Sequence, residues 1–107
     1  MTLHKATKVV IITEKLIADK VCQIVDEAGA SGYTRTAAGG KGSRDVRRSL
    51  TDRASVVNEF SNIKIEVIVP DRATAEDIMN RVSSKFFKNY SGITYLENTE
   101  ILRPEKF

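Results

Sequence analysis

A glycine- and arginine-rich string is the part of this sequence best suited to chemistry. Residues 39–44 read Gly-Gly-Lys-Gly-Ser-Arg, and Arg47 follows three positions after Arg44. Glycines let backbone N–H groups converge on an anion where a Cβ would obstruct them, and arginine presents paired donors to phosphate oxygens. The string therefore indicates an anion cradle. From composition alone, a solvated and flexible basic loop is an equally weighted alternative.

The positive charge of the chain is concentrated around this string. The 107 residues carry a formal net charge of +3, whereas residues 35–53 alone hold six Lys and Arg against two Asp. The local charge is therefore +4, and the rest of the chain sums to −1. No hydroxyl residue directly follows Lys41, and Asp45 stands where the last glycine of a dinucleotide fingerprint would be. These two departures exclude a Walker A loop and a Rossmann fingerprint.

Other reactive side chains are few. The chain has one cysteine, Cys22, and one histidine, His4, which lies in a predicted polar N-terminal tail. These counts exclude an internal disulfide and argue against a zinc site or a Ser-His-Asp triad built from one chain. Cys22 lies beside an apolar helical stripe, and Phe86, Phe87 and Tyr90 crowd the end of another, so we predict that all four pack in the core. We expect no metal and no catalytic residue.

The apolar runs indicate where the protein resides. The longest of them, Val9–Ile12, is far shorter than a bilayer span. No apolar run of signal-peptide length follows the N-terminal Met-Thr-Leu-His-Lys. We therefore expect a cytoplasmic protein.

The first third of the chain predicts a strand, a helix and a second strand. The β-branched run Val9–Ile12 stops at Thr13, which can cap the helix that follows. Gly29 stands where a helix ends in the left-handed conformation. Between them, apolar residues recur at helical spacing: Ile17, Val21, Ile24, Val25 and Ala28. Residues 33–37 read as the second strand.

The same order of elements returns after residue 60. Residues 63–69 alternate apolar and polar up to Pro70, and Asp71 or Thr74 opens a helix whose apolar stripe is Ala75, Ile78, Met79, Val82 and Phe86. A last strand begins at Gly92, where Ser-Gly-Ile-Thr echoes the Ser-Gly-Tyr-Thr of residues 31–34. Two such halves predict an α+β, ferredoxin-like βαββαβ fold in a single domain over residues 1–107. Its uncovered sheet face is partly apolar, which favours a homo-oligomer over a loop folded across that face.

The loop between the second and third predicted strands, about residues 38–60, is unusually long. Loops of such length in compact domains are generally functional or disordered. A basic loop on this fold also suggests an RNA-recognition domain, which stacks bases on aromatic residues of its two central strands. The corresponding strands here contain no Phe, Tyr or Trp. We therefore expect no specific binding of nucleic acid.

Four segments together resemble one protein family. They are residues 10–15 (Val-Ile-Ile-Thr-Glu-Lys), residues 26–33, the glycine string 39–44, and the pattern Phe87-x-x-Tyr90-x-Gly92-Ile93. Over residues 8–102 the chain is similar to PII-like signalling proteins of the SbtB family, the cyanobacterial partners of the sodium-dependent bicarbonate transporter SbtA. The resemblance implies a homotrimer with a long T-loop and with adenine nucleotides in the clefts between subunits. The nucleotides are cyclic AMP, AMP, ADP and ATP, with cyclic di-AMP as a further candidate.

The resemblance also implies roles for individual residues. It assigns the phosphate, ribose and adenine of the nucleotide to Gly40, Lys41, Gly42, Ser43, Arg44, Arg47, Gly92 and Ile93. It assigns the protein partner to the outer T-loop, with contacts from Arg48, Arg53, Val56, Val57 and Phe60. The chain departs from some family members at its end, which lacks their Cys-Gly-Pro-Glu-Gly-Cys segment. A redox-switched C-terminal loop therefore does not transfer to this chain.

These expectations describe a signalling protein that regulates bicarbonate transport in a carbon-concentrating mechanism. Such a protein would associate peripherally with the membrane through the transporter and would have no cofactor beyond its nucleotide ligands. The alternative is a small nucleotide phosphohydrolase that uses the same loop. A hydrolase needs a held metal or an activated water, and the loop offers only Asp45 and Asp52 as carboxylates. We expect that the protein is not an enzyme, although weak nucleotide hydrolysis stays open.

Overall fold

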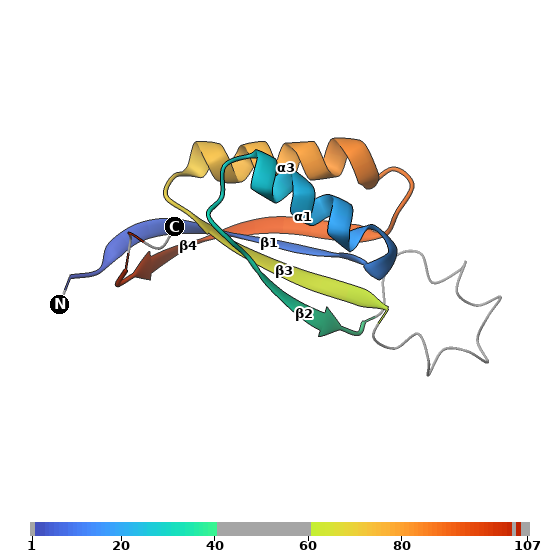
Figure 1. Cartoon of the computed structure of the whole chain (residues 1–107), viewed down its shortest axis with the longest axis horizontal. Coiled ribbons are helices and arrows are strands. Elements are labelled where there is room, and N and C mark those ends of the chain that lie inside the picture. Colours follow the sequence, from blue (N-terminus) through green and yellow to red (C-terminus); the bar gives the residue numbers. More distant parts are fainter. Residues whose placement is uncertain (1, 41–60, 104, 106–107) are drawn as a thin grey trace.

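Four strands form one antiparallel sheet that carries two helices on a single face (Figure 1). The computed structural model describes residues 2–40, 61–103 and 105. The strands are β1 (His4–Glu14), β2 (Thr34–Ala38), β3 (Asn62–Val69) and β4 (Gly92–Ile101), in the spatial order β2-β3-β1-β4. The helices are α1 (Ala18–Glu27) and α3 (Arg72–Phe86). The predicted ferredoxin-like βαββαβ fold is confirmed.

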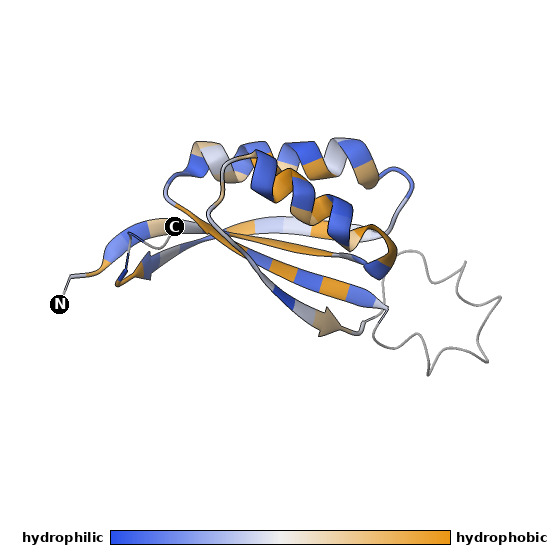
Figure 2. Cartoon of the chain, viewed as in Figure 1, coloured by the Kyte–Doolittle hydropathy of each residue, from blue (hydrophilic) through white to orange (hydrophobic). Residues whose placement is uncertain are grey.

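The core lies between the sheet and the two helices. Alternation along β1 and β3 turns Val9, Ile11, Ile65 and Val67 toward the helices, and all four are fully buried. Figure 2 shows α1 with an apolar side and a polar side. The predicted apolar residues Ile17, Val21, Ile24, Val25, Ala75, Ile78, Val82 and Phe86 are buried, while Ala28 and Met79 are partly buried against them. Ala18 of α1, which the stripe did not include, is also fully buried. Apolar periodicity therefore located the core correctly.

The two helices begin differently. Asp71 caps α3, because its side chain accepts a hydrogen bond from the Thr74 N–H at 2.7 Å. The prediction that Thr13 caps the first helix is wrong: Thr13 is buried inside β1, and a 3-10 turn, η1 (Lys15–Ile17), leads into α1 without a side-chain cap. Gly29 follows α1 with φ +95°, the left-handed conformation predicted there.

The first strand is longer than the apolar run that predicted it. β1 begins at His4, which pairs with Ile101 of β4, so His4 belongs to the sheet and not to a polar tail. Polar residues continue the strand because backbone hydrogen bonds to β4 are available to them. The helices of the described part are all too short or too polar to cross a membrane.

Candidate functional site

All four strands bring a terminus to one end of the sheet. In the register, Ala38 of β2 lies beside Asn62 of β3, and Asn62 lies beside Glu14 of β1. On the other side of β1, Thr13 pairs with Gly92, the first residue of β4. The chain leaves this end after Ala38 and returns to it before Asn62, so both ends of the predicted T-loop lie here (Figure 1). We call this edge of the molecule the loop end.

The loop end contains the described members of the predicted nucleotide site. Gly40 follows β2, while Gly92 and Ile93 begin β4, and Ile93 is 57% exposed. β2 and β4 are the two outer strands, so these residues lie three interstrand spacings apart, about 14 Å across the sheet. One chain therefore brings them to the same end but not into contact.

The other predicted contacts lie outside the described residues. For the nucleotide these are Lys41, Gly42, Ser43, Arg44 and Arg47, and for the protein partner Arg48, Arg53, Val56, Val57 and Phe60. Arg35 is the one of the six Lys and Arg in residues 35–53 that the structure describes, and it lies on β2, where it pairs with Asp19 of α1 at 2.7 Å. Its charge is thus partly balanced by Asp19.

The turn before Gly92 is held tightly at the loop end. The Glu14 carboxylate accepts a hydrogen bond from the Ser91 N–H at 2.5 Å, and the Thr13 hydroxyl donates to the Ser91 carbonyl at 3.5 Å. A Cβ on Gly92 would lie 2.6 Å from Cζ of Phe87 and 3.0 Å from the Ile12 carbonyl oxygen. Packing therefore favours glycine at this position, which the family resemblance assigns to the nucleotide.

Sequence reasoning missed Glu14. In the sequence, an acidic residue between a strand and a helix indicates a favourable charge for the first helical turn. Its bond to Ser91 joins residues 77 positions apart, and only the strand register places them together. The segment Thr13-Glu14-Lys15 belongs to the family resemblance, which was the available signal.

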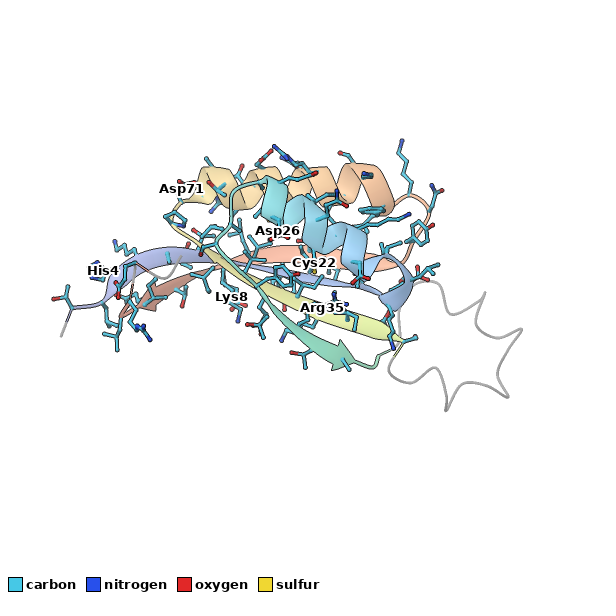
Figure 3. All side chains as sticks on the ribbon, in the orientation of Figure 1. His4, Lys8, Cys22, Asp26, Arg35 and Asp71 are labelled. Atoms are coloured by element: carbon cyan, nitrogen blue, oxygen red, sulfur yellow. The ribbon has the colours of Figure 1, made fainter. Side chains whose placement is uncertain are left out.

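The sheet face away from the helices carries a charged cluster among apolar side chains. Lys8 Nζ lies 2.8 Å from Glu66 Oε2 and 3.9 Å from Glu97 Oε1 (Lys8 is labelled in Figure 3). The hydrogen bond between Lys8 and Glu66 raises the pKa of the lysine and lowers the pKa of the carboxyl. The Lys8–Glu66 pair therefore stays ionised over the neutral range. Apolar neighbours on this face are Val10, Ile12, Ile68, Ile93 and Tyr95.

The cysteine lies on the buried side of α1 and not at the loop end (Figure 3). Cys22 is 3% exposed, and burial raises the pKa of its thiol. A raised pKa keeps the thiol protonated and unreactive at neutral pH. Phe86 is buried, while Phe87 and Tyr90 pack against the core, as we predicted for all four side chains. Within residues 2–40, 61–103 and 105, no three His, Cys, Asp or Glu side chains gather closely enough to hold a metal.

The chain matches one protein family and is similar to solved structures of PII-like proteins. Residues 6–106 match the model of the family Nitrogen regulatory protein P-II. A PII-like signalling protein of Thermus thermophilus shares 36% identity, with a TM-score of 0.79, over 100% of this chain and 99% of its own. CPII of Thiomonas intermedia, a nitrogen regulatory PII-like protein solved with ADP, AMP and bicarbonate, shares 26% identity and a TM-score of 0.78, over 99% of this chain and 96% of its own.

Proposed function

Because the chain belongs to the nitrogen regulatory protein P-II family, we propose that it is a signalling protein that binds adenine nucleotides at the loop end. The site is formed between subunits of a homotrimer, and binding changes how the T-loop contacts a protein partner. Candidate ligands are cyclic AMP, AMP, ADP, ATP and cyclic di-AMP. The observation that carries the proposal is the arrangement of the loop end, where Gly40 and the Gly92–Ile93 pair lie at the same end of the sheet as the two ends of the T-loop.

The distance across the sheet supports a site shared by subunits. Gly40 and Gly92 lie on opposite edges of the sheet, about 14 Å apart by strand spacing, so neither edge alone encloses a ligand. Packing subunits side by side brings the β2 edge of one beside another subunit. PII proteins are trimers that bind adenine nucleotides, and CPII of Thiomonas, at 26% identity, was solved with ADP and AMP.

The open sheet face supports the trimer. Ile93 is 57% exposed and Tyr95 is 37% exposed, and both lie on the face that the helices leave uncovered. Exposed apolar side chains gathered on one face mark an association surface. Subunits that pack through this face would remove Ile93 and Tyr95 from water and enclose the Lys8–Glu66 pair.

The phosphate contacts of the proposed site come from the glycine string and its arginines. Gly40, Lys41, Gly42 and Ser43 supply backbone N–H groups and an ammonium, and Arg44 and Arg47 supply guanidinium groups. Phosphate draws together cations that otherwise repel one another, so the nucleotide biases the conformation of the T-loop. This is the step that converts nucleotide binding into a signal.

The proposed partner is a bicarbonate transporter of the SbtA type. Arg48, Arg53, Val56, Val57 and Phe60, on the outer T-loop, would contact it and hold the protein at the membrane surface. The support is the resemblance of the glycine string and of residues 10–15 to the SbtB family. Co-purification of the transporter with the parent protein, and its loss with Arg53→Ala, would establish this contact.

Calorimetric titration with adenosine, AMP, ADP, ATP and cyclic AMP tests nucleotide binding. Hydrogen bonds to charged groups contribute about 1.5 to 3 kcal/mol each, so Arg44→Ala and Arg47→Ala should each weaken AMP binding roughly ten- to a hundredfold. Arg53→Ala is the matched control and should bind AMP as the parent does. Light scattering should find folded trimers throughout. Adenosine binding as tightly as AMP would remove the phosphate site from the loop.

A second readout separates signalling from hydrolysis. The same samples, incubated with ATP and Mg²⁺, should release no phosphate beyond one equivalent per site. Sustained multiple turnover would instead favour a phosphohydrolase.

A further inference from the structure

Three consecutive residues at the junction of β1 and η1 connect the two segments that border the proposed nucleotide site. The Lys15 N–H donates to the Ser61 carbonyl at 2.8 Å, directly before β3. The Glu14 carboxylate accepts from the Ser91 N–H, directly before Gly92, and the Thr13 hydroxyl donates to the Ser91 carbonyl. The return point of the T-loop and the turn before β4 are therefore both bonded to residues 13–15.

The turn on one side of this connection is well fixed. The N–H groups of Asn89 and Tyr90 donate to the Phe86 carbonyl at 3.1 and 2.9 Å, and the Phe86 and Tyr90 rings meet edge to face. Gly92 packs closely, because a Cβ at this position would meet the Phe87 ring and the Ile12 carbonyl oxygen. The turn can therefore shift only together with its neighbours.

The connecting residues are also fixed in the sheet. Thr13 is 1% exposed and pairs with Ile63 on one side and Gly92 on the other. Glu14 is half-buried and pairs with Asn62. Packed elements of this kind transmit displacement, because interiors are close-packed and have low compressibility.

We propose that Glu14 is a positioning residue that couples the turn at residues 87–91 to the return point of the T-loop at Ser61. Its carboxylate holds Ser91 so that Gly92 and Ile93 are ready for ligand, and a shift of Ser91 is passed through Glu14 and Lys15 to Ser61. The inference rests on the proposed function for the identity of the ligand. The bonds that carry it run from the Ser91 N–H to the Glu14 carboxylate and from the Lys15 N–H to the Ser61 carbonyl.

A carboxylate suits this role better than a neutral side chain. Hydrogen bonds from an N–H to an ionised acceptor are stronger than neutral ones. Removing the acceptor leaves the part-buried Ser91 N–H without its partner. Glu14→Ala therefore removes one of the two bonds that join Ser91 to residues 13–15, whereas Glu14→Gln keeps an oxygen acceptor on a side chain of the same length and removes only the charge.

The experiment compares the parent protein, Glu14→Ala, Glu14→Gln and Glu76→Ala. Glu76→Ala is the matched control, because it removes an exposed carboxylate that pairs with Arg72 on the opposite side of the molecule from the sheet's open face. Calorimetry should find AMP bound about tenfold more weakly by Glu14→Ala, less affected in Glu14→Gln and unchanged in the control. Binding of AMP by Glu14→Ala as tight as by the parent would overturn the positioning role.

Amide NMR supplies a readout that a merely structural role would not move. In the parent, saturating AMP should shift the amide resonances of Gly92 and also those of Ser61 and Asn62. In Glu14→Ala at saturating AMP, the shift at Gly92 should persist while the shift at Asn62 is lost. A shift at Asn62 that survives the substitution would overturn the coupling.

A ligand-free measurement separates this inference from the proposed function. If the parent binds none of the candidate adenine nucleotides, the proposed function fails, and amide exchange without ligand then decides the coupling. Glu14→Ala should speed exchange at Ser91 and at Asn62, whereas Glu76→Ala should change neither. Faster exchange confined to Ser91 would show that the turn and the return point are independent.

Discussion

The two βαβ halves of the chain repeat the same order of elements but use the acidic residue between strand and helix differently. In the second half Asp71 accepts the Thr74 N–H and caps its own helix, at the end of the sheet opposite the loop end. In the first half Glu14 accepts the Ser91 N–H from a distant turn, and α1 begins after a 3-10 turn without a side-chain cap. The half that lacks the cap is the one whose junction borders the proposed site.

The core is shared by the two halves, and its disruption should have the largest effect. Ile11 of β1 and Ile65 of β3 are paired in register, and both are fully buried. Ile11→Ala and Ile65→Ala should each lower the free energy of unfolding by about 2 to 5 kcal/mol, because each leaves a cavity in the core. Urea unfolding measures this, with Thr36→Ala on the exposed strand β2 as a control that should change it little. A large loss of unfolding free energy for only one of the two variants would mean that the halves do not share one core.

The second largest effect concerns the glycines of the repeated Ser-Gly segments, which should differ in how much a substitution destabilises the protein. A Cβ on Gly92 meets the Phe87 ring and the Ile12 carbonyl, whereas a Cβ on Gly32 meets nothing within 4 Å. Gly92→Ala should therefore destabilise the protein by about 1 to 3 kcal/mol through overpacking. Gly32→Ala, the matched change in the other half, should be close to neutral. Equal effects in urea unfolding would contradict the packing described for Gly92.

The capped helix should give the smallest effect. Asp71→Ala removes the N-cap of α3 and should lower the midpoint of thermal unfolding by a few degrees while leaving AMP affinity unchanged. Scanning calorimetry on parent and variant measures the unfolding midpoint, and titration calorimetry measures AMP affinity. Glu14→Ala should show the opposite pattern, with a larger effect on AMP affinity than on the midpoint of thermal unfolding.

The Asp71 cap also predicts a pH dependence. The Thr74 N–H lowers the pKa of the Asp71 carboxyl. A group with a lowered folded pKa stabilises the protein above its unfolded pKa, about 4, and loses that contribution as the pH falls through the folded value. The difference in unfolding midpoint between parent and Asp71→Ala should therefore be full at neutral pH and shrink below about pH 4. A difference that grows on acidification would contradict the assignment.

Much of the fold could be predicted from the sequence, because the signals that set it are local. Alternation in residues 63–69 and helical spacing from Ile17 onward depend on near neighbours, and Gly29 and Asp71 mark helix ends within one turn. The extension of β1 back to His4 was missed, because polar residues there are held by pairing with β4, which no local pattern reveals. Thr13 was misread as a cap for the same reason.

The candidate site was predicted less completely. Gly92 and Ile93 were named from a resemblance, and the structure adds that they share the loop end with Gly40. Glu14 could not be found as a partner of Ser91, because the bond depends on a strand pairing between residues far apart in the chain. The arginines of the glycine string remain predictions that rest on charge and spacing.

The central claim is that the loop end binds the nucleotide. Mapping amide chemical shifts of the labelled parent protein during titration with AMP tests it most directly. The account predicts that the largest shifts among the described residues fall on Gly40, Ser91, Gly92 and Ile93. Shifts concentrated instead at the opposite end of the sheet, around Asp71 and Glu100, would contradict it.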